Sequence, residues 1–222
     1  MIELISLQEL VAKHWSLDAI NLYPSGVDVV DSIRLRESKL LKFLPGQLLR
    51  RFDAGFARSC TVHPDTGRAL YTICRASQAK HVFETGTYWG YSTAYLAAAV
   101  RDTDPDGKVY TFDIYPRAGR HIPNSLRPQV ELYRGKPSIE TMPKILERIV
   151  PDMFFQDSRH DYEGVTEELN VIVPHLKSKA IILFHDFVVP GVRQAAIDSL
   201  KNFSLYVLNS QDPQQLGVAI KQ

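Results

Sequence analysis

From His81 onward, short apolar runs alternate with longer segments of helical spacing. Five of these runs, at 81–86, 108–115, 129–135, 152–158 and 179–186, are rich in β-branched or aromatic residues and end near Gly, Asp or Ser, and two further apolar runs follow at 203–210 and 216–222. Runs of this length and composition are typical of strands buried on both faces of a sheet.

The segments between these runs carry apolar residues on one helical face. The positions that share a face are Ile139, Met142, Ile145, Leu146 and Ile149 in one segment and Val165, Leu169, Ile172 and Leu176 in another. Alternation of strands and helices predicts right-handed crossovers and a parallel sheet. Only a turn-forming segment, 211–215, separates the last two runs, which predicts a terminal hairpin. The pattern therefore predicts an α/β, Rossmann-like, mostly parallel seven-stranded sheet with helices on both faces and a C-terminal antiparallel hairpin.

The first part of the chain has a different pattern. Helical patches at 6–14, 37–44 and 47–52 are separated by turn-rich pieces, and no strand alternation is visible there. We expect an N-terminal helical cap or extension over residues 1–66, followed by the α/β domain over residues 67–222.

Composition narrows the function classes. Hydrophobic residues make up 45% of the chain and the formal net charge is +1, which disfavours a nucleic-acid groove or a membrane-binding face. No apolar run approaches the ~20 residues of a membrane span, and the first residues lack a signal-peptide pattern. Cys60 and Cys74 are too few for a disulfide framework, so both are expected to be reduced and buried. We expect a cytoplasmic protein.

A glycine loop, ETGTYWGYS from Glu84 to Ser92, joins the first predicted strand to an Ala-rich helix. Gly86 and Gly90 allow a tight turn and close approach of a ligand, and free N–H groups at the helix start add a polar anchor. The loop lacks the GxGxxG spacing of dinucleotide sites, which disfavours a nicotinamide dehydrogenase. An acid two residues before the first glycine suits a ligand with an ammonium group. An ordinary strand-to-helix turn is the alternative.

Asp113 ends the next predicted strand. A carboxylate at that strand end can accept hydrogen bonds from both hydroxyls of a ribose.

The run VFETGTYWGYSTAYLA resembles the cofactor loop of class I S-adenosylmethionine-dependent methyltransferases, in particular the catechol O-methyltransferase-like and sugar or antibiotic O-methyltransferase-like groups (methyltransferase domain 24). The resemblance covers roughly residues 70–191 and implies S-adenosylmethionine as cofactor. The cofactor-binding residues that it implies are Glu84, Gly86, Tyr88, Gly90 and Ser92 at the methionine part, Asp113 at the ribose, Ile114 and Ser138 near the adenine, and Asp157. Ser138 has an alternative role as the cap of the following helix.

A second group of polar residues follows the fourth and fifth predicted strands. Asp157 ends one and His160 lies three residues on; His185 and Asp186 end the other. Neighbouring strand ends lie roughly 5 Å apart, so these groups can converge. Carboxylates suit Mg²⁺, whereas an imidazole suits Mn²⁺ or Fe²⁺.

The resemblance bears on this second group as well. Metal-dependent O-methyltransferases carry an acid at the position of Asp157 and an acid followed by Asn or Asp where this chain has His185-Asp186. The implied metal ligands are Asp157, His185 and Asp186, with Mg²⁺ or Mn²⁺ as the cation. A site without metal stays open at this point.

The resulting hypothesis is in-line methyl transfer from a sulfonium to a hydroxyl of a small-molecule acceptor. His160 is the candidate general base beside Asp157, and a solvated loop residue is its alternative role. Two other functions stay open: a non-catalytic cofactor-fold binding protein, and a metal-dependent hydroxylase-like enzyme on the same fold. We expect no nucleic-acid or membrane partner, and a homodimer.

Overall fold

The computed structural model describes residues 2–16 and 62–222. The helical patches predicted at 37–44 and 47–52 lie outside these residues, as does Cys60. Cys74 is buried and free, as predicted. Among the described residues, no helix combines the length and apolar character needed to cross a bilayer.

The centre of the fold is an eight-stranded sheet with the order β1-β7-β8-β6-β5-β2-β3-β4. The strands are β1 (Glu3–Ile5), β2 (His81–Thr85), β3 (Lys108–Asp113), β4 (Val130–Arg134), β5 (Met153–Gln156), β6 (Ile181–Phe184), β7 (Phe203–Leu208) and β8 (Gly217–Lys221). Only β8 runs against its neighbours, β6 and β7. The mostly parallel sheet and the terminal antiparallel hairpin are therefore confirmed.

One strand more is present than the pattern predicts. β1 pairs in parallel with the outer edge of β7 and places Ile5 opposite Leu208. We expected no strand in this part of the chain, and that expectation is wrong for residues 3–5. Of the three residues only Ile5 is buried. So short an edge strand shows no alternation, because pairing with β7 determines its conformation.

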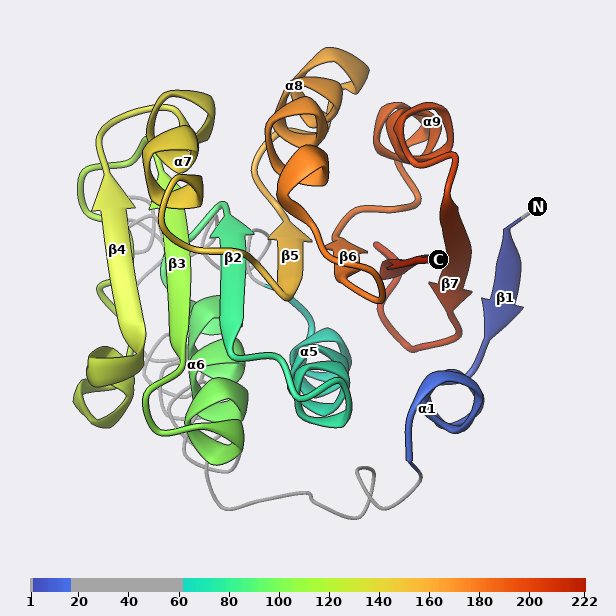
Figure 1. Cartoon of the computed structure of the whole chain (residues 1–222), viewed down its shortest axis with the longest axis horizontal. Helices are drawn as coiled ribbons and strands as arrows, with labels where there is room; N and C mark the ends of the chain where they lie inside the picture. Colours follow the sequence, from blue (N-terminus) through green and yellow to red (C-terminus); the bar gives the residue numbers. More distant parts are fainter. Residues whose placement is uncertain (1, 17–61) are drawn as a thin grey trace, which may run out of the picture.

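Helices cover both faces of the sheet. They are α1 (Leu7–His14), α5 (Pro64–Ala76), α6 (Tyr91–Thr103), α7 (Ser138–Leu146), α8 (Tyr162–Ile172) and α9 (Pro190–Ser199), with the short 3₁₀ helices η2 (Asn124–Gln129) and η3 (Val173–His175). Figure 1 shows α1, α5 and α6 on one face and α7, α8 and α9 on the other. Two hydrophobic clusters fill the corresponding layers. The helical patch predicted at 6–14 is confirmed as α1.

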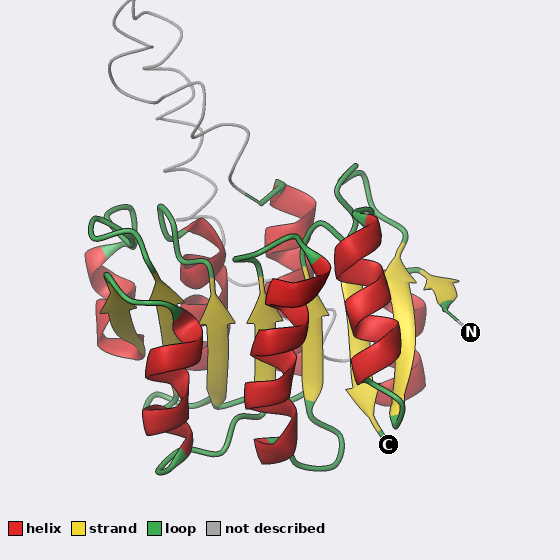
Figure 2. Ribbon diagram, turned by 90° about the horizontal axis from the view of Figure 1, so that it is seen from above, coloured by secondary structure: helices red, strands yellow, loops and turns green. Residues whose placement is uncertain are grey.

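The strand order reverses between β2 and β5. The chain proceeds from β2 to β3 and β4 on one side, and from β5 to β6 on the other. In such sheets ligands bind beyond the carboxyl ends of the strands at this switch point. Figure 2 shows the arrowheads of the parallel strands along one edge, with the connecting loops beyond them. The glycine loop and both acidic strand ends lie at this edge.

Backbone hydrogen bonds extend the strand ladders into these loops. Gly86 donates its N–H to the carbonyl of Phe112 at 2.9 Å, and Asp157 donates to Thr85 at 2.9 Å. His185 donates to Gln156 at 3.0 Å. The three loops are thus held in register with one another, which fixes the positions of the side chains they carry.

Candidate active site

A pocket of about 730 Å³ lies at the carboxyl ends of β2, β3, β5 and β6. Most residues predicted from the sequence line it: Gly86, Tyr88, Asp113, Ile114, Ser138, Asp157, His160, His185 and Asp186. Glu84, Gly90 and Ser92 do not line this pocket. The structure therefore joins the two predicted groups of residues in one cavity.

Gly86 and Gly90 shape the loop as the sequence predicts. Both have φ above +90°, a region that disfavours side chains. A Cβ on Gly86 would lie 2.0 Å from the backbone oxygen of Asp157. Gly90 precedes α6, whose first turn has no side-chain cap. Gly86 therefore permits close contact between two loops, and Gly90 leaves polar N–H groups at the helix start.

Glu84 lies behind the glycine loop. Its carboxylate is fully buried and accepts hydrogen bonds from the hydroxyls of Ser92, at 2.6 Å, and Thr93, at 2.5 Å. Burial raises its pKa to about 7, although these hydroxyls act in the opposite direction. The hydrogen bond between Glu84 of β2 and Ser92 of α6 thus connects the two ends of the glycine loop.

Asp113 connects the glycine loop to the loop after β3. Its two carboxylate oxygens accept hydrogen bonds from the backbone N–H of Tyr88 at 2.6 Å and of Tyr115 at 2.7 Å. Each oxygen has a further lone pair, so the carboxylate can still accept from a ligand. Beside it Ile114 is 69% exposed and lines the pocket. An apolar side chain at this position can cover a flat ring.

One of the two roles predicted for Ser138 is wrong. α7 begins at Ser138 itself and has no side-chain cap bond, so the helix-cap alternative is wrong. Its hydroxyl instead donates to Glu168 of α8 at 2.6 Å. Sequence reasoning missed Glu168, which is only 2% exposed. Its position between Val165 and Leu169 on the apolar face of α8 was the available signal.

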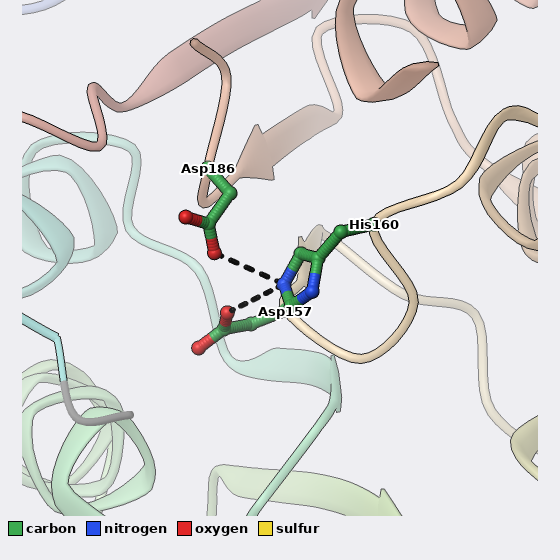
Figure 3. Close-up of side chains that lie close together, drawn as sticks. All are labelled: Asp157, His160 and Asp186. Atoms are coloured by element: carbon green, nitrogen blue, oxygen red, sulfur yellow. Dashed lines mark ion pairs between the residues drawn. The ribbon is translucent and has the colours of Figure 1, made fainter. Parts of the chain in front are cut away.

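Asp157, His160 and Asp186 converge on the other side of the pocket (Figure 3). The Nε2 atom of His160 lies 3.0 Å from Oδ2 of Asp186 and 3.8 Å from Oδ1 of Asp157. One ligand atom from each of the three side chains lies within 4.8 Å of the others. Asp186 has φ of 51°, an uncommon value for a residue with a side chain. Strained backbone of this kind is frequent at functional sites.

His185 approaches the same carboxylates from the protein interior. Its ring is buried, with Nδ1 2.9 Å from Asp157 and 3.1 Å from Asp186. Its Nε2 lies 3.6 Å from Asp212, which accepts a short hydrogen bond from the hydroxyl of Thr66. The imidazole that completes the three-residue cluster is thus that of His160, whereas we expected His185. Asp212, from the turn between β7 and β8, was missed.

The carboxylates favour the protonated forms of both imidazoles. Asp157 and Asp186 together raise the pKa of His160 to about 10. Burial opposes a charge on His185, but attraction to Asp157 and further acids raises its pKa to about 12. Although burial favours neutral Asp186, the two imidazoles hold its pKa well below the usual range. This side of the pocket is a compact cluster of opposite charges.

Comparison with known families gives two matches. Residues 83–187 match a family described as methyltransferase domain, and residues 36–124 match one described as O-methyltransferase. A catechol O-methyltransferase from Niastella koreensis is 31% identical over 105 residues, which are 44% of this chain and 46% of that protein. The chain thus matches about half the length of this curated relative. These matches confirm the resemblance predicted from the glycine loop.

Solved structures share the fold over nearly the whole chain. The O-methyltransferase TomG from Streptomyces achromogenes, solved with S-adenosylmethionine, has a TM-score of 0.66 at 17% identity and covers 95% of this chain and 98% of its own. An O-methyltransferase from Bacillus cereus, solved with S-adenosylhomocysteine, has a TM-score of 0.65 at 17% identity and covers 96% and 100%. The predicted Rossmann-like fold is confirmed.

Proposed function

Residues 83–187 match the methyltransferase domain family, and from this match we propose that the chain is an S-adenosylmethionine-dependent O-methyltransferase that acts on a hydroxyl of a small molecule. The observation that carries the proposal is that one pocket of about 730 Å³ is lined both by Asp113 and by the cluster of Asp157, His160 and Asp186. Its volume lies within the range of about 300–1,000 Å³ that is usual for small-molecule sites.

The residues at the carboxyl ends of β2 and β3 fit S-adenosylmethionine. Gly86 keeps the loop free of a side chain beside the pocket, and Asp113 has carboxylate lone pairs for the two ribose hydroxyls. The exposed side chain of Ile114 would pack on the adenine ring. S-adenosylmethionine, when bound, supplies an electrophilic methyl group.

The residues after β5 and β6 fit a divalent cation. Asp157 and Asp186 offer carboxylate oxygens and His160 offers an imidazole nitrogen, all within 4.8 Å of one another. Mixed oxygen and nitrogen ligands suit Mn²⁺ or Fe²⁺ better than Mg²⁺, which takes oxygen ligands. Such a cation, when bound, would lower the pKa of a coordinated hydroxyl.

The remaining chemistry belongs to the protein side chains. When the methyl donor is bound, the pocket residues would have to place the acceptor hydroxyl within reach of the methyl group, which the donor would supply with its sulfur as the leaving group. The hydroxyl proton must leave in the same process. Without a bound cation, His160 in its neutral form would accept that proton, and Asp157 and Asp186 would stabilise the resulting imidazolium.

The ligand role and the base role of His160 exclude each other, because both need the lone pair on the same Nε2 atom. The two roles can be distinguished by measuring turnover after divalent ions have been removed with a chelator. As a base, His160 keeps turnover active after dialysis against EDTA, and His160→Ala abolishes it. As a ligand, turnover falls on dialysis and returns with added Mn²⁺. We expect the second result, since the three side chains already converge.

Calorimetric titration with S-adenosylhomocysteine tests the proposed function. We expect wild-type binding with a Kd in the micromolar range, about −8 kcal/mol. Asp113→Ala should weaken binding about 100-fold, because it removes charge-assisted hydrogen bonds. Asp106→Ala, which removes an exposed acid from the turn before β3, is the matched control and should bind as wild type. Absence of binding by wild type would refute the proposal, and equal binding by Asp113→Ala would place the ribose elsewhere.

Binding alone does not distinguish an enzyme from a cofactor-fold binding protein. Turnover of a catechol with labelled S-adenosylmethionine addresses that alternative. The N-terminal cap, a homodimer and a cytoplasmic location stay predictions.

A further inference from the structure

Glu168 of α8 is a buried acid in the wall of the pocket, only 2% exposed. Its Oε1 accepts hydrogen bonds from the hydroxyls of Ser138 at 2.6 Å and Ser158 at 2.7 Å. Its Oε2 accepts from the hydroxyl of Thr85 at 3.0 Å and, more weakly, from the amide of Gln156 at 3.4 Å. Within residues 2–16 and 62–222, no lysine, arginine or histidine forms an ion pair with it. Neutral donors from α7 and from the ends of two strands, β2 and β5, therefore hold this carboxylate.

These hydrogen bonds determine whether the serine hydroxyls in the pocket wall can donate a hydrogen bond to a ligand or only accept one. A serine hydroxyl has one proton and two lone pairs. Ser138 and Ser158 both commit their proton to Glu168, and both also line the pocket. Toward a ligand they can therefore only accept hydrogen bonds. A ligand that presents another acceptor there would leave two buried acceptors facing each other, which is costly.

Apolar side chains line the same pocket as the two serine hydroxyls. Ile114 follows β3 and Ile139 follows Ser138; both are exposed and both line the pocket. Two aliphatic side chains next to hydroxyl acceptors suit a flat heterocycle that carries a hydrogen-bond donor on its edge. An exocyclic amino group is such a donor.

We propose that Glu168 is a positioning residue that turns the hydroxyls of Ser138 and Ser158 into obligatory acceptors, so that the pocket selects a nucleoside with an amino group at the purine 6-position over its 6-oxo counterpart. The proposal rests on the proposed function, because it takes the purine to be part of the methyl donor. Glu168 itself acts through the two serines and need not contact the ligand.

The test compares the affinities of S-adenosylhomocysteine and S-inosylhomocysteine by calorimetry. We expect wild type to prefer the adenine compound at least about tenfold, as sites built around a hydrogen-bond donor do. Glu168→Gln keeps the shape of the side chain but offers one oxygen and one NH₂ group, so that one serine hydroxyl can turn and donate. The preference should then fall below about threefold. Glu163→Gln, an exposed acid on the same helix, is the control and should keep the wild-type preference.

A second variant covers the case in which Glu168→Gln does not fold, as judged by circular dichroism. Ser138→Ala with Ser158→Ala removes both acceptors and should likewise reduce the preference below about threefold. Equal affinities of wild type for the two compounds, or a wild-type preference kept by the variants, overturn the inference and leave the proposed function intact. Failure of wild type to bind either compound refutes both.

Discussion

After β2 and β3 the pocket is shaped mainly by backbone, whereas after β5 and β6 it is shaped by charged side chains. On the first side, Gly86 touches the backbone of Asp157, and Asp113 holds two backbone N–H groups. On the second side, a nitrogen of each of the two imidazoles lies within about 4 Å of an oxygen of both Asp157 and Asp186. Substitutions that add side-chain volume should therefore have their largest effects on the first side, and substitutions that change a charge should have theirs on the second.

This difference also separates the two tasks of the pocket. A backbone cradle can hold a ligand of fixed shape without changing its own charge state. A cluster of carboxylates and imidazoles can bind a cation or exchange a proton. Substitutions on the two sides should therefore affect different measurements, and the following predictions test that separation.

Gly86→Ala should have the largest effect. The new Cβ would lie 2.0 Å from a backbone oxygen, and φ is +92°. We expect a loss of more than about 4 kcal/mol in the free energy of unfolding, the size reserved for severe steric conflict. Urea denaturation measures it.

Gly135→Ala is the matched control for this prediction. Gly135 also has positive φ, +80°, but a Cβ there would meet nothing within 4 Å. Backbone strain alone should cost about 1–2 kcal/mol. Similar losses of stability for the two variants would show that the positive φ, and not the contact with the loop of Asp157, is what disfavours a side chain at residue 86.

Asp157→Asn should come next, with its effect on turnover. The amide keeps the shape of the side chain but loses the charge that faces both imidazoles. We expect turnover to fall roughly a thousandfold, about 4 kcal/mol in activation free energy, while the affinity for S-adenosylhomocysteine changes less than about threefold. Steady-state kinetics and calorimetry measure the two quantities. A parallel fall in affinity would mean that the two sides of the pocket do not act separately.

The backbone side is also the side that the sequence predicts well. The strands from His81 onward have strong local patterns, so their ends and the residues that follow them could be placed. Gly86 and Asp113 carry roles that depend on positions within single loops. Their place in the pocket was therefore accessible from the residues alone.

The charged side depends on contacts between distant segments, which no local pattern contains. Asp212 reaches His185 only because β8 inserts between β6 and β7. Whether His160 or His185 joins the carboxylates depends on the path of the loop after β5, which spacing does not determine. The edge strand β1 was missed because its pairing with β7, and not its local pattern, determines its conformation. Glu168 was missed although its position on the apolar face of α8 was a local signal, because its partners come from distant segments.

Glu84 gives the smallest predicted effect, seen in the pH dependence of stability. Burial raises its pKa in the folded state to about 7, from 4.5. Above pH 4.5 the unfolded chain releases this proton while the folded protein keeps it, so the unfolded state is favoured as pH rises. Between about pH 4.5 and 7 this carboxyl should therefore reduce the free energy of unfolding by up to about 3 kcal/mol, at 1.36 kcal/mol per pKa unit.

Glu84→Gln removes this titration, so the difference in stability between variant and wild type should increase in favour of the variant across that window. Glu140→Gln, an exposed acid on α7, provides the control and should show a constant difference. The stability that the raised pKa values of His160 and His185 contribute begins to fall only above the unfolded value near 6.5, and both proteins share that decrease. A constant difference between Glu84→Gln and wild type from pH 4.5 to 7 would mean that the hydroxyls of Ser92 and Thr93 fully offset the burial of the carboxylate, and that the support beneath the glycine loop is charged throughout.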